Sequence, residues 1–221
     1  RDQGGDQPFE SRYEILGELG RGAMGVVFKA RDKNLGRVVA LKSLPDNLRE
    51  HPTAVALFKR EAQAAAALNH RNIVTLFDAG QEDGSYFISM ELLEGKPLNA
   101  ILDRVGQFSA HDVCLLGTQI AAGLQYAHDK RIVHRDIKTA NLFFTRDKIV
   151  KIMDFGLAKT IEEVRKHSTM IGGTPYYMAP EQAAGGEIGP ATDLYALGVT
   201  LHRLVTGTFP FTEGDLAYHH R

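Results

Sequence analysis

The chain has 221 residues, of which 26 are Lys or Arg and 27 are Asp or Glu, so its formal net charge is -1 at pH 7. This near-neutral balance argues against bulk electrostatic binding to nucleic acid or to an anionic membrane surface. Its content of hydrophobic residues, 43%, is too high for general disorder. The single cysteine, Cys114, excludes an internal disulfide and suggests a reducing compartment. We find no uninterrupted apolar run of about 18 residues, which argues against a membrane span within these residues.

Residues 1–11 are polar, contain paired glycines and a proline and lack periodicity, which predicts a flexible leader. Over residues 13–92, short apolar runs rich in β-branched residues alternate with Gly, Asp or Asn turns, a pattern typical of strands. The predicted strands are residues 13–16, 26–28, 37–42, 73–77 and 86–93. One helix is predicted among them, over residues 53–68, because apolar residues recur there at spacings of three and four.

Beyond residue 98 the pattern becomes helical. Ser109 followed by Asp112 has the form of a capping box and predicts the start of a helix that reaches about Lys130. We expect Cys114 to be a buried small hydrophobe of this helix. The apolar residues predicted to form its buried face are Val113, Leu116, Ile120, Leu124 and Ala127.

Three further segments follow in chain order. Short strands are predicted at residues 142–144 and 149–152. Residues 154–180 show little periodicity, and so long a loop inside a domain is usually functional or disordered. A buried helix is predicted over residues 192–205, with Leu194, Leu197, Leu201 and Leu204 on one face. The order of elements therefore indicates a small β-rich lobe followed by a helix-rich lobe.

Gly20, Gly22 and Gly25 form a GxGxxG pattern between two predicted strands. Glycines let a backbone approach phosphate oxygens, but the pattern alone also fits a hairpin turn. Its strand-turn-strand setting argues against a dinucleotide-binding turn, which would open a helix. Lys42 at the end of a strand and Glu61 on the predicted helix fit solvated surface residues when each is taken alone. As a pair near the glycine loop, they would direct the ammonium toward nucleotide phosphates.

The strings HRDIKTAN at residues 134–141 and DFG at residues 154–156 decide between these alternatives. Asp136 and Asn141 lie five residues apart in a non-periodic segment, so a curved loop can direct both to one site. Asp154 follows a short predicted strand and supplies a further hard oxygen ligand, of the kind that Mg²⁺ prefers. At about 5% per specified residue, the chance of the glycine loop and both strings together is on the order of 10^-5.

With these strings the chain resembles the eukaryotic-type (Hanks-type) protein kinase family, from about residue 13 to its end. Ala179-Pro-Glu181 and the DLYALG string at residues 193–198 are similar to further elements of that family. Lys138 and Gly173-Thr174 make the chain similar to the serine/threonine branch of the family. The sequences of several strings are similar to those of bacterial members.

The resemblance implies an α+β, protein-kinase-like bilobal fold. Its small antiparallel-β N-lobe, with one long helix, would span residues 12–90, and a hinge would span residues 91–95. A mainly helical, partial C-lobe would span residues 96–221 and would lack the last helices of such a domain.

The resemblance also implies an ATP-dependent serine/threonine protein kinase that acts in signal transduction. Asp136 would accept the proton of the substrate hydroxyl, and Lys138 would lie near the γ-phosphate. Lys42, oriented by Glu61, would hold the α- and β-phosphates. Asn141 and Asp154 would bind Mg²⁺, with Mn²⁺ as an alternative. The residues implied to contact ATP are Leu19, Gly20, Gly22, Gly25, Val27, Ala40, Lys42, Met90, Glu91, Leu93 and Phe143.

The long loop also carries candidate regulatory hydroxyls. A phosphate adds a charge of about -1.5 to -2, which Arg135 could pair with to order the loop. We therefore expect autophosphorylation at Thr169, with Ser168 second, and a homodimer would allow it in trans. The alternative is that both are solvated loop hydroxyls. Thr174 is expected to be structural or to position the substrate, near Asp136 and Lys138.

Two departures from the family pattern stand out. Thr139 occupies a position where the family often has proline, and Pro97 lies near where some relatives place an acid that contacts ribose. The sequence stops at Arg221, before the helices that complete such a domain and carry the arginine partner of Glu181, so we expect a fragment of a longer chain.

The alternative function is an ATP-binding pseudokinase or scaffold module that the truncation makes inactive. As partners we expect protein substrates with Ser/Thr acceptors, no nucleic acid and no membrane contact within this chain. The expected location is the cytoplasm. In one interpretation, the chain is the cytoplasmic domain of a longer, membrane-anchored receptor kinase.

Overall fold

The computed structural model describes residues 12–22, 25–44, 67–82, 84–155 and 175–211, together with several helical positions between residues 52 and 66. The chain divides into two units. Residues 1–68 and 75–93 form the first unit, and residues 69–74 and 94–221 form the second. The predicted leader, residues 1–11, lies outside the described residues.

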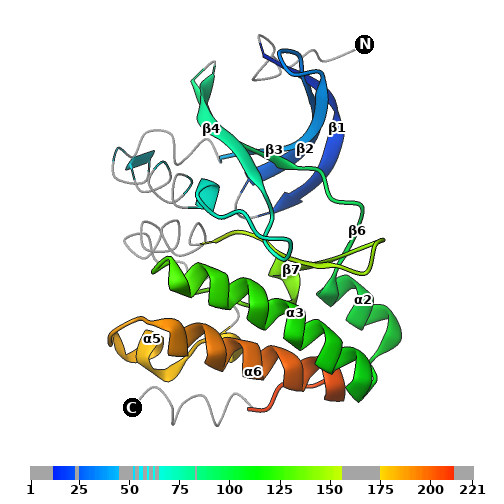
Figure 1. Ribbon diagram of the computed structural model, residues 1–221, viewed down its shortest axis with the longest axis vertical. Helices are drawn as coiled ribbons and strands as arrows, with labels where there is room; N and C mark the ends of the chain where they lie inside the picture. Colours follow the sequence, from blue (N-terminus) through cyan, green and yellow to red (C-terminus); the bar gives the residue numbers. More distant parts are fainter. Residues whose placement is uncertain are drawn as a thin grey trace. The chain divides into compact units, whose positions relative to one another are not determined.

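The first unit is built on a five-stranded antiparallel sheet in the order β1-β2-β3-β5-β4 (Figure 1). The strands are β1 (Tyr13–Gly22), β2 (Gly25–Asp32), β3 (Arg37–Ser43), β4 (Leu76–Glu82) and β5 (Ser85–Glu91). The turn between β2 and β3 forms because Asp32 Oδ1 accepts hydrogen bonds from the N–H groups of Asn34 and Leu35, at 3.0 Å and 3.3 Å. Gly36 then takes the positive φ of 66° that closes this turn.

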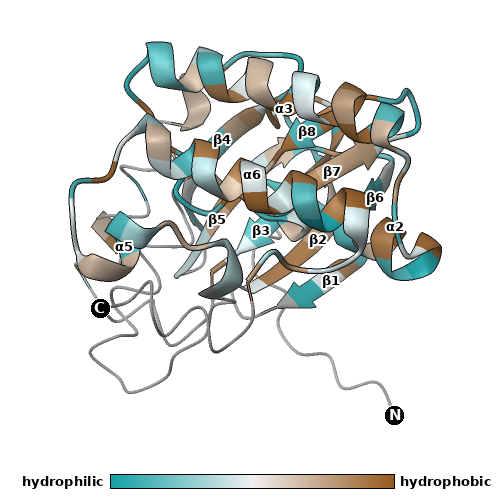
Figure 2. Cartoon of the chain, turned by 90° about the horizontal axis from the view of Figure 1, so that it is seen from below, coloured by the Kyte–Doolittle hydropathy of each residue, from teal (hydrophilic) through white to brown (hydrophobic). Residues whose placement is uncertain are grey.

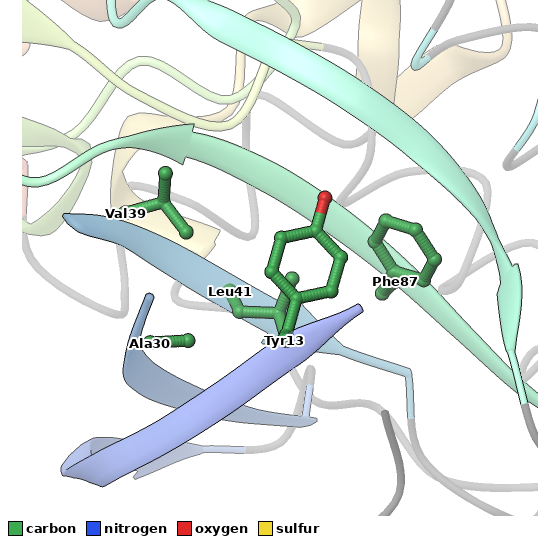
Figure 3. Close-up of a cluster of buried hydrophobic side chains, with 5 residues drawn as sticks. All are labelled: Tyr13, Ala30, Val39, Leu41 and Phe87. Atoms are coloured by element: carbon green, nitrogen blue, oxygen red, sulfur yellow. The ribbon is translucent and has the colours of Figure 1, made fainter. Parts of the chain in front are cut away.

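Apolar side chains from four strands pack together on one face of this sheet. Figure 3 shows the cluster, in which the ring of Tyr13 meets the ring of Phe87 edge-on, with 5.2 Å between centroids. Its members are Tyr13, Ala30, Val39, Leu41 and Phe87, and all are buried. Since side chains alternate along a strand, the cluster also defines which residues of β3 lie on the opposite face.

One predicted strand is placed wrongly. Residues 73–77 were expected to form a strand, but β4 begins at Leu76, and Ile73 belongs to the second unit, where it forms an isolated parallel bridge with Ile152. β4 continues through Asp78 and Gly80, which have low β-propensity, so the apolar pattern did not extend the prediction over them.

The predicted helix of residues 53–68 is described only in part. Several positions between residues 52 and 66 are helical, and Ala62, Ala65 and Leu68 are buried.

The second unit combines helices with a small antiparallel sheet in the order β6-β7-β8. The strands are β6 (Gly95–Pro97), β7 (Leu142–Thr145) and β8 (Val150–Ile152), so the strands predicted at residues 142–144 and 149–152 are confirmed. The helices are α2 (Leu98–Val105), α3 (Ala110–Asp129), α5 (Pro180–Ala184) and α6 (Pro190–Thr206), with 3-10 turns η2 (Thr139–Asn141) and η3 (Pro175–Tyr177). β6, α2 and α5 were not predicted, because each is too short to show a clear period.

Helix α3 begins as its sequence predicts. Ser109 Oγ accepts a hydrogen bond from the N–H of Asp112 at 3.1 Å, and all five residues predicted for the buried face are buried. The expectation for Cys114 is wrong, because this residue is exposed on α3. Figure 2 shows that α3 carries both hydrophobic and hydrophilic residues. In the part of the chain that the structure describes, no helix is both long enough and apolar enough to cross a membrane.

Helix α6 lies beside α3 (Figure 1), and the face predicted to be buried is only partly correct. Leu197 and Leu204 are buried, whereas Leu194 is 55% exposed. The buried face also includes three polar residues, Thr192, Asp193 and Thr200, which are all hydrogen-bonded. A count of apolar residues cannot anticipate this, since it places polar residues at the surface.

Candidate active site

The loop of residues 134–141, called the HRD loop below, brings three predicted site residues together in the second unit. Lys138 Nζ lies 2.8 Å from Asp136 Oδ2. Asn141 Nδ2 donates to that oxygen at 2.9 Å and to the Asp136 main-chain oxygen at 2.8 Å. The Lys138 and Asp136 side chains are 26% and 25% exposed, so both still reach solvent. Both donors take Oδ2, so among the described residues Oδ1 is the Asp136 oxygen that can accept from a further donor such as an alcohol.

A backbone hydrogen bond connects the segment that contains Asp154 to this cluster. The N–H of Met153 donates to the carbonyl oxygen of Asn141 at 2.9 Å, so the residue before Asp154 is bonded directly to the end of the HRD loop. Asp154 has a φ of 58°, a left-handed conformation uncommon for a residue with a Cβ. Such outliers cluster at functional sites, where the surrounding structure enforces them.

Asn141 and Asp154 also have the chemistry of a magnesium site. The Asn141 amide nitrogen is bonded to Asp136, so the amide oxygen is the atom that can bind a cation. An amide oxygen and a carboxylate are hard oxygen ligands, and Mg²⁺ in proteins usually combines one or two such groups with phosphate oxygens and water. In the described part of the chain there is no group of three or more His, Cys, Asp or Glu that could hold a metal without such help.

His134 fastens the start of the HRD loop to the segment before Asp154. Its Nδ1 accepts from the N–H of Asp136 at 3.2 Å, so Nε2 carries the hydrogen that it donates to the Met153 carbonyl oxygen at 2.7 Å. The ring also meets Phe155 edge-on, with 4.7 Å between centroids. His134 is fully buried and acts as a bridge between the two segments.

Asp193 on α6 holds the same loop from its other side. Its Oδ1 accepts from the N–H of Arg135 at 2.7 Å, and its Oδ2 accepts from the N–H of His134 at 2.8 Å. Nε2 of His128 on α3 also lies 2.7 Å from Oδ2. The carboxylate is fully buried, and these contacts hold Arg135 at a φ of 70°.

In the first unit, strand register gathers four of the predicted ATP-contact residues on one face. Lys42 pairs with Val27 on one side and with Ile88 on the other, and Ala40 pairs with Met90. Directly paired residues share a face, as do residues two apart on one strand. Val27, Ala40, Lys42 and Met90 therefore lie on the face opposite the cluster of Figure 3.

The glycine pattern forms the paired ends of β1 and β2. Gly20 is opposite Val27, and Gly22 is opposite Gly25. Gly25 has a φ of 113°, which side chains rarely adopt, so glycine is required there. Leu19 lies in a bulge of β1 and is 52% exposed.

The remaining predicted ATP contacts lie at the ends of elements. Glu91 closes β5, where its N–H donates to the Thr75 carbonyl oxygen at 2.9 Å and its Oε1 accepts from the Thr75 N–H at 2.7 Å. Leu93 is the last residue of the first unit. Phe143 belongs to β7 of the second unit and is half-buried.

Four predicted site residues lie outside the described residues: Glu61, Ser168, Thr169 and Thr174. Conversely, the sequence interpretation missed the contacts of Tyr177 and Gln182. Gln182 Nε2 donates to the Arg135 carbonyl oxygen at 3.0 Å, and Tyr177 Oη lies 3.0 Å from Thr139 Oγ1. No local pattern marks such contacts, because they join residues 38 and 47 positions apart in the chain.

Comparisons with known proteins identify the family of this chain. The family described as "Protein kinase domain" matches residues 13–221. Serine/threonine-protein kinase PrkC of Bacillus subtilis is 38% identical over 207 residues, which are 93% of this chain and 32% of PrkC. Serine/threonine-protein kinase PknA of Mycobacterium tuberculosis is 39% identical over 210 residues, 92% of this chain and 48% of PknA. The chain thus spans about a third to a half of the length of these relatives.

Solved structures give the same result for the fold. The crystal structure of the PknI kinase domain of Mycobacterium tuberculosis matches with a TM-score of 0.75 at 29% identity, over 91% of this chain and 75% of that chain. The predicted protein-kinase-like α+β fold is therefore confirmed, as is the predicted resemblance to bacterial serine/threonine kinases.

Proposed function

This chain belongs to the protein kinase family, and on that premise we propose that it transfers the γ-phosphate of ATP to serine and threonine hydroxyls of proteins. The observation that carries the proposal is the set of polar contacts that hold the Asp136 carboxylate. One oxygen of its carboxylate is held by Lys138 and Asn141, while the backbone of Asn141 is bonded to the residue before Asp154. These are the groups that phosphoryl transfer needs at one place.

In the proposed reaction the acceptor hydroxyl attacks the γ-phosphorus of ATP. A new P–O bond forms to the hydroxyl oxygen, the bond from the γ-phosphorus to the β-phosphate oxygen breaks, and ADP leaves. The hydroxyl proton goes to the carboxylate of Asp136, through the Oδ1 atom that Lys138 and Asn141 leave open. Lys138 would offset negative charge on the transferring group.

ATP would be bound by the face of the first-unit sheet that carries Val27, Ala40, Lys42 and Met90. The apolar members of this set suit the adenine ring, and the Lys42 ammonium suits the phosphates. The glycine backbone at the ends of β1 and β2 would approach the phosphates closely. Asn141 and Asp154 would hold Mg²⁺ or Mn²⁺, which neutralises charge on the phosphate oxygens when bound.

The test compares Asp136→Asn with the wild type, each incubated with labelled ATP, Mg²⁺ and a generic basic protein. Loss of the proton acceptor should lower kcat by about 10²–10⁴-fold, while nucleotide affinity measured by calorimetry stays within about twofold. Asp147→Asn, the same change in the exposed turn between β7 and β8, is the control and should retain activity. A wild type that binds ATP but transfers no phosphate would instead support the pseudokinase or scaffold function.

We also propose that the chain autophosphorylates Thr169, and Ser168 secondarily, and that the phosphate pairs with Arg135. Support comes from Arg135, whose backbone is fixed by Asp193 and Gln182 while its side chain is exposed. Phosphosite mapping after incubation with ATP should find Thr169 modified. Asp136→Asn protein mixed with active protein distinguishes the routes, because its phosphorylation requires a second copy. Absence of phosphate on both hydroxyls would contradict this proposal.

The proposed substrates are proteins with serine or threonine acceptors, and the proposed location is the cytoplasm, where ATP is available. PrkC and PknA are named serine/threonine-protein kinases, which supports this substrate class.

A further inference from the structure

The hydroxyl of Thr139 makes a contact that proline, the residue the family often has at this position, could not make. Thr139 opens η2 within the HRD loop and is 1% exposed. Its Oγ1 lies 3.0 Å from the phenol oxygen of Tyr177, which belongs to η3 and is also buried. Two buried hydroxyls at this distance form a hydrogen bond, because a buried hydroxyl without a partner is costly.

Arg203 extends this contact to helix α6. Its Nη1 donates to Tyr177 Oη at 2.6 Å, and its guanidinium lies 4.3 Å from the centroid of the Phe209 ring. An arginine has only donors, so Tyr177 Oη is the acceptor of this bond. Donation from a cation polarises the phenol and makes its O–H a stronger donor, which favours Tyr177 as the donor to Thr139.

Helix α6 thereby reaches the HRD loop at two points. Asp193 binds the N–H groups of His134 and Arg135 at the start of the loop. Arg203, ten residues further along α6 and about 15 Å away at the rise of an α-helix, reaches Thr139 near the end of the loop through Tyr177. The short η2 turn then runs from Thr139 to Asn141, whose amide holds Asp136.

We infer that Thr139, Tyr177 and Arg203 form a second anchor that positions Lys138 and Asn141 against Asp136. This inference rests on the proposed kinase function. The three residues touch no reacting atom, so they are positioning residues, and the anchor acts on the placement of Asp136 rather than on nucleotide binding. Misplacement of a catalytic group by a fraction of an ångström lowers the rate of the chemical step.

The experiment compares Tyr177→Phe, Thr139→Ala and the double variant in the full-length protein. Each single variant should lower kcat about tenfold, with the KM for ATP within about twofold of the wild type. Both substitutions break the same contact, between Thr139 and Tyr177. The kcat of the double variant should therefore also fall about tenfold rather than a hundredfold. Thr139→Ser keeps the hydroxyl and should restore kcat to within about twofold of the wild type.

Tyr195→Phe, which removes a tyrosine hydroxyl on α6, away from the Thr139–Tyr177 contact, is the matched control and should leave kcat unchanged. Amide hydrogen exchange gives a readout that needs no activity. In Tyr177→Phe, exchange should become faster over residues 136–142 and stay unchanged in α3.

Full kcat in both single variants, or losses that multiply in the double variant, would overturn the inference while the kinase function stands. If the wild type transfers no phosphate, the proposed function fails, and the exchange measurement alone decides the inference: unchanged exchange over residues 136–142 overturns it.

Discussion

The two units fix their candidate site residues by different means. In the first unit, Val27, Ala40 and Lys42 share a face because the antiparallel ladder fixes their backbones, whatever their side chains are. The HRD loop of the second unit has no such ladder, and buried side chains hold its backbone, chiefly the carboxylate of Asp193. A ladder tolerates many side-chain changes, whereas a loop held by one carboxylate depends on that residue.

The largest effect that this comparison predicts is that of Asp193→Ala. The substitution leaves the buried N–H groups of His134 and Arg135 without an acceptor and His128 without its partner. We expect the free energy of unfolding of the second unit to fall by about 3–5 kcal/mol and kinase activity to disappear. Urea unfolding followed by hydrogen exchange over residues 132–136 measures both the size and the location of the loss.

The matched control for this prediction is Asp103→Ala, which removes a carboxylate from the exposed surface of α2. It should change stability by no more than about 0.5 kcal/mol. If Asp193→Ala were equally mild, the HRD loop would not depend on this side chain, and the contrast between the units would disappear.

A smaller effect is expected in the first unit, where one buried carboxylate also binds backbone donors. Asp32 is fully buried and accepts from Leu35 and Asn34 at the β2–β3 turn and from Arg12. Burial alone raises the pKa of Asp32, but the N–H of Leu35 and the guanidinium of Arg12 outweigh burial, so the net pKa is lowered. Asp32→Asn should cost about 2 kcal/mol at pH 7, less than Asp193→Ala, because the ladder remains.

The sign of the pH dependence follows from the lowered pKa of Asp32. A carboxyl group with a lower pKa in the folded state stabilises the fold fully above its unfolded pKa, about 3.9, and loses that contribution as the pH falls through its folded pKa. The stability difference between the wild type and Asp32→Asn should therefore shrink below about pH 4. Urea midpoints from pH 7 to pH 3 measure it, and a difference that stays constant would show that the ionised carboxylate is not the source.

The same contrast explains what the sequence could predict. Strings such as HRDIKTAN were sufficient to predict the family and to single out candidate site residues, because the proposed chemistry restricts them to one type at one spacing. The strand pattern around Lys42 was likewise sufficient to place that residue on β3. Long-range polar contacts were out of reach, because Tyr177 and Thr139 meet only after folding. The buried face of α6 was predicted only in part for the same reason, since the burial of Asp193 depends on hydrogen bonds to residues far away in the sequence.

Replacement of a glycine by alanine separates the two units most sharply, because it should affect the KM for ATP in the first unit and stability in the second. In the first unit it should also have the smallest effect on stability. In Gly20→Ala the new Cβ would meet no atom within 4 Å, so the free energy of unfolding should change by less than about 0.5 kcal/mol. The methyl group would nevertheless lie opposite Val27, at the proposed phosphate contact, and should raise the KM for ATP about tenfold. Gly17→Ala on the same strand, also unobstructed, should leave both quantities unchanged.

Gly95→Ala in the second unit should show the reverse behaviour. Gly95 has a φ of 154°, and a Cβ at this position would clash with the main-chain oxygen of Phe144, so the backbone of β6 or β7 must shift. We expect a loss of about 1–3 kcal/mol in unfolding free energy, measured in urea, with the KM for ATP unchanged in the protein that remains folded. If Gly20→Ala instead lowered stability and left the KM unchanged, glycine would be a folding requirement of the β1–β2 hairpin. The position of Gly20 in the GxGxxG pattern would then give no evidence for bound phosphate.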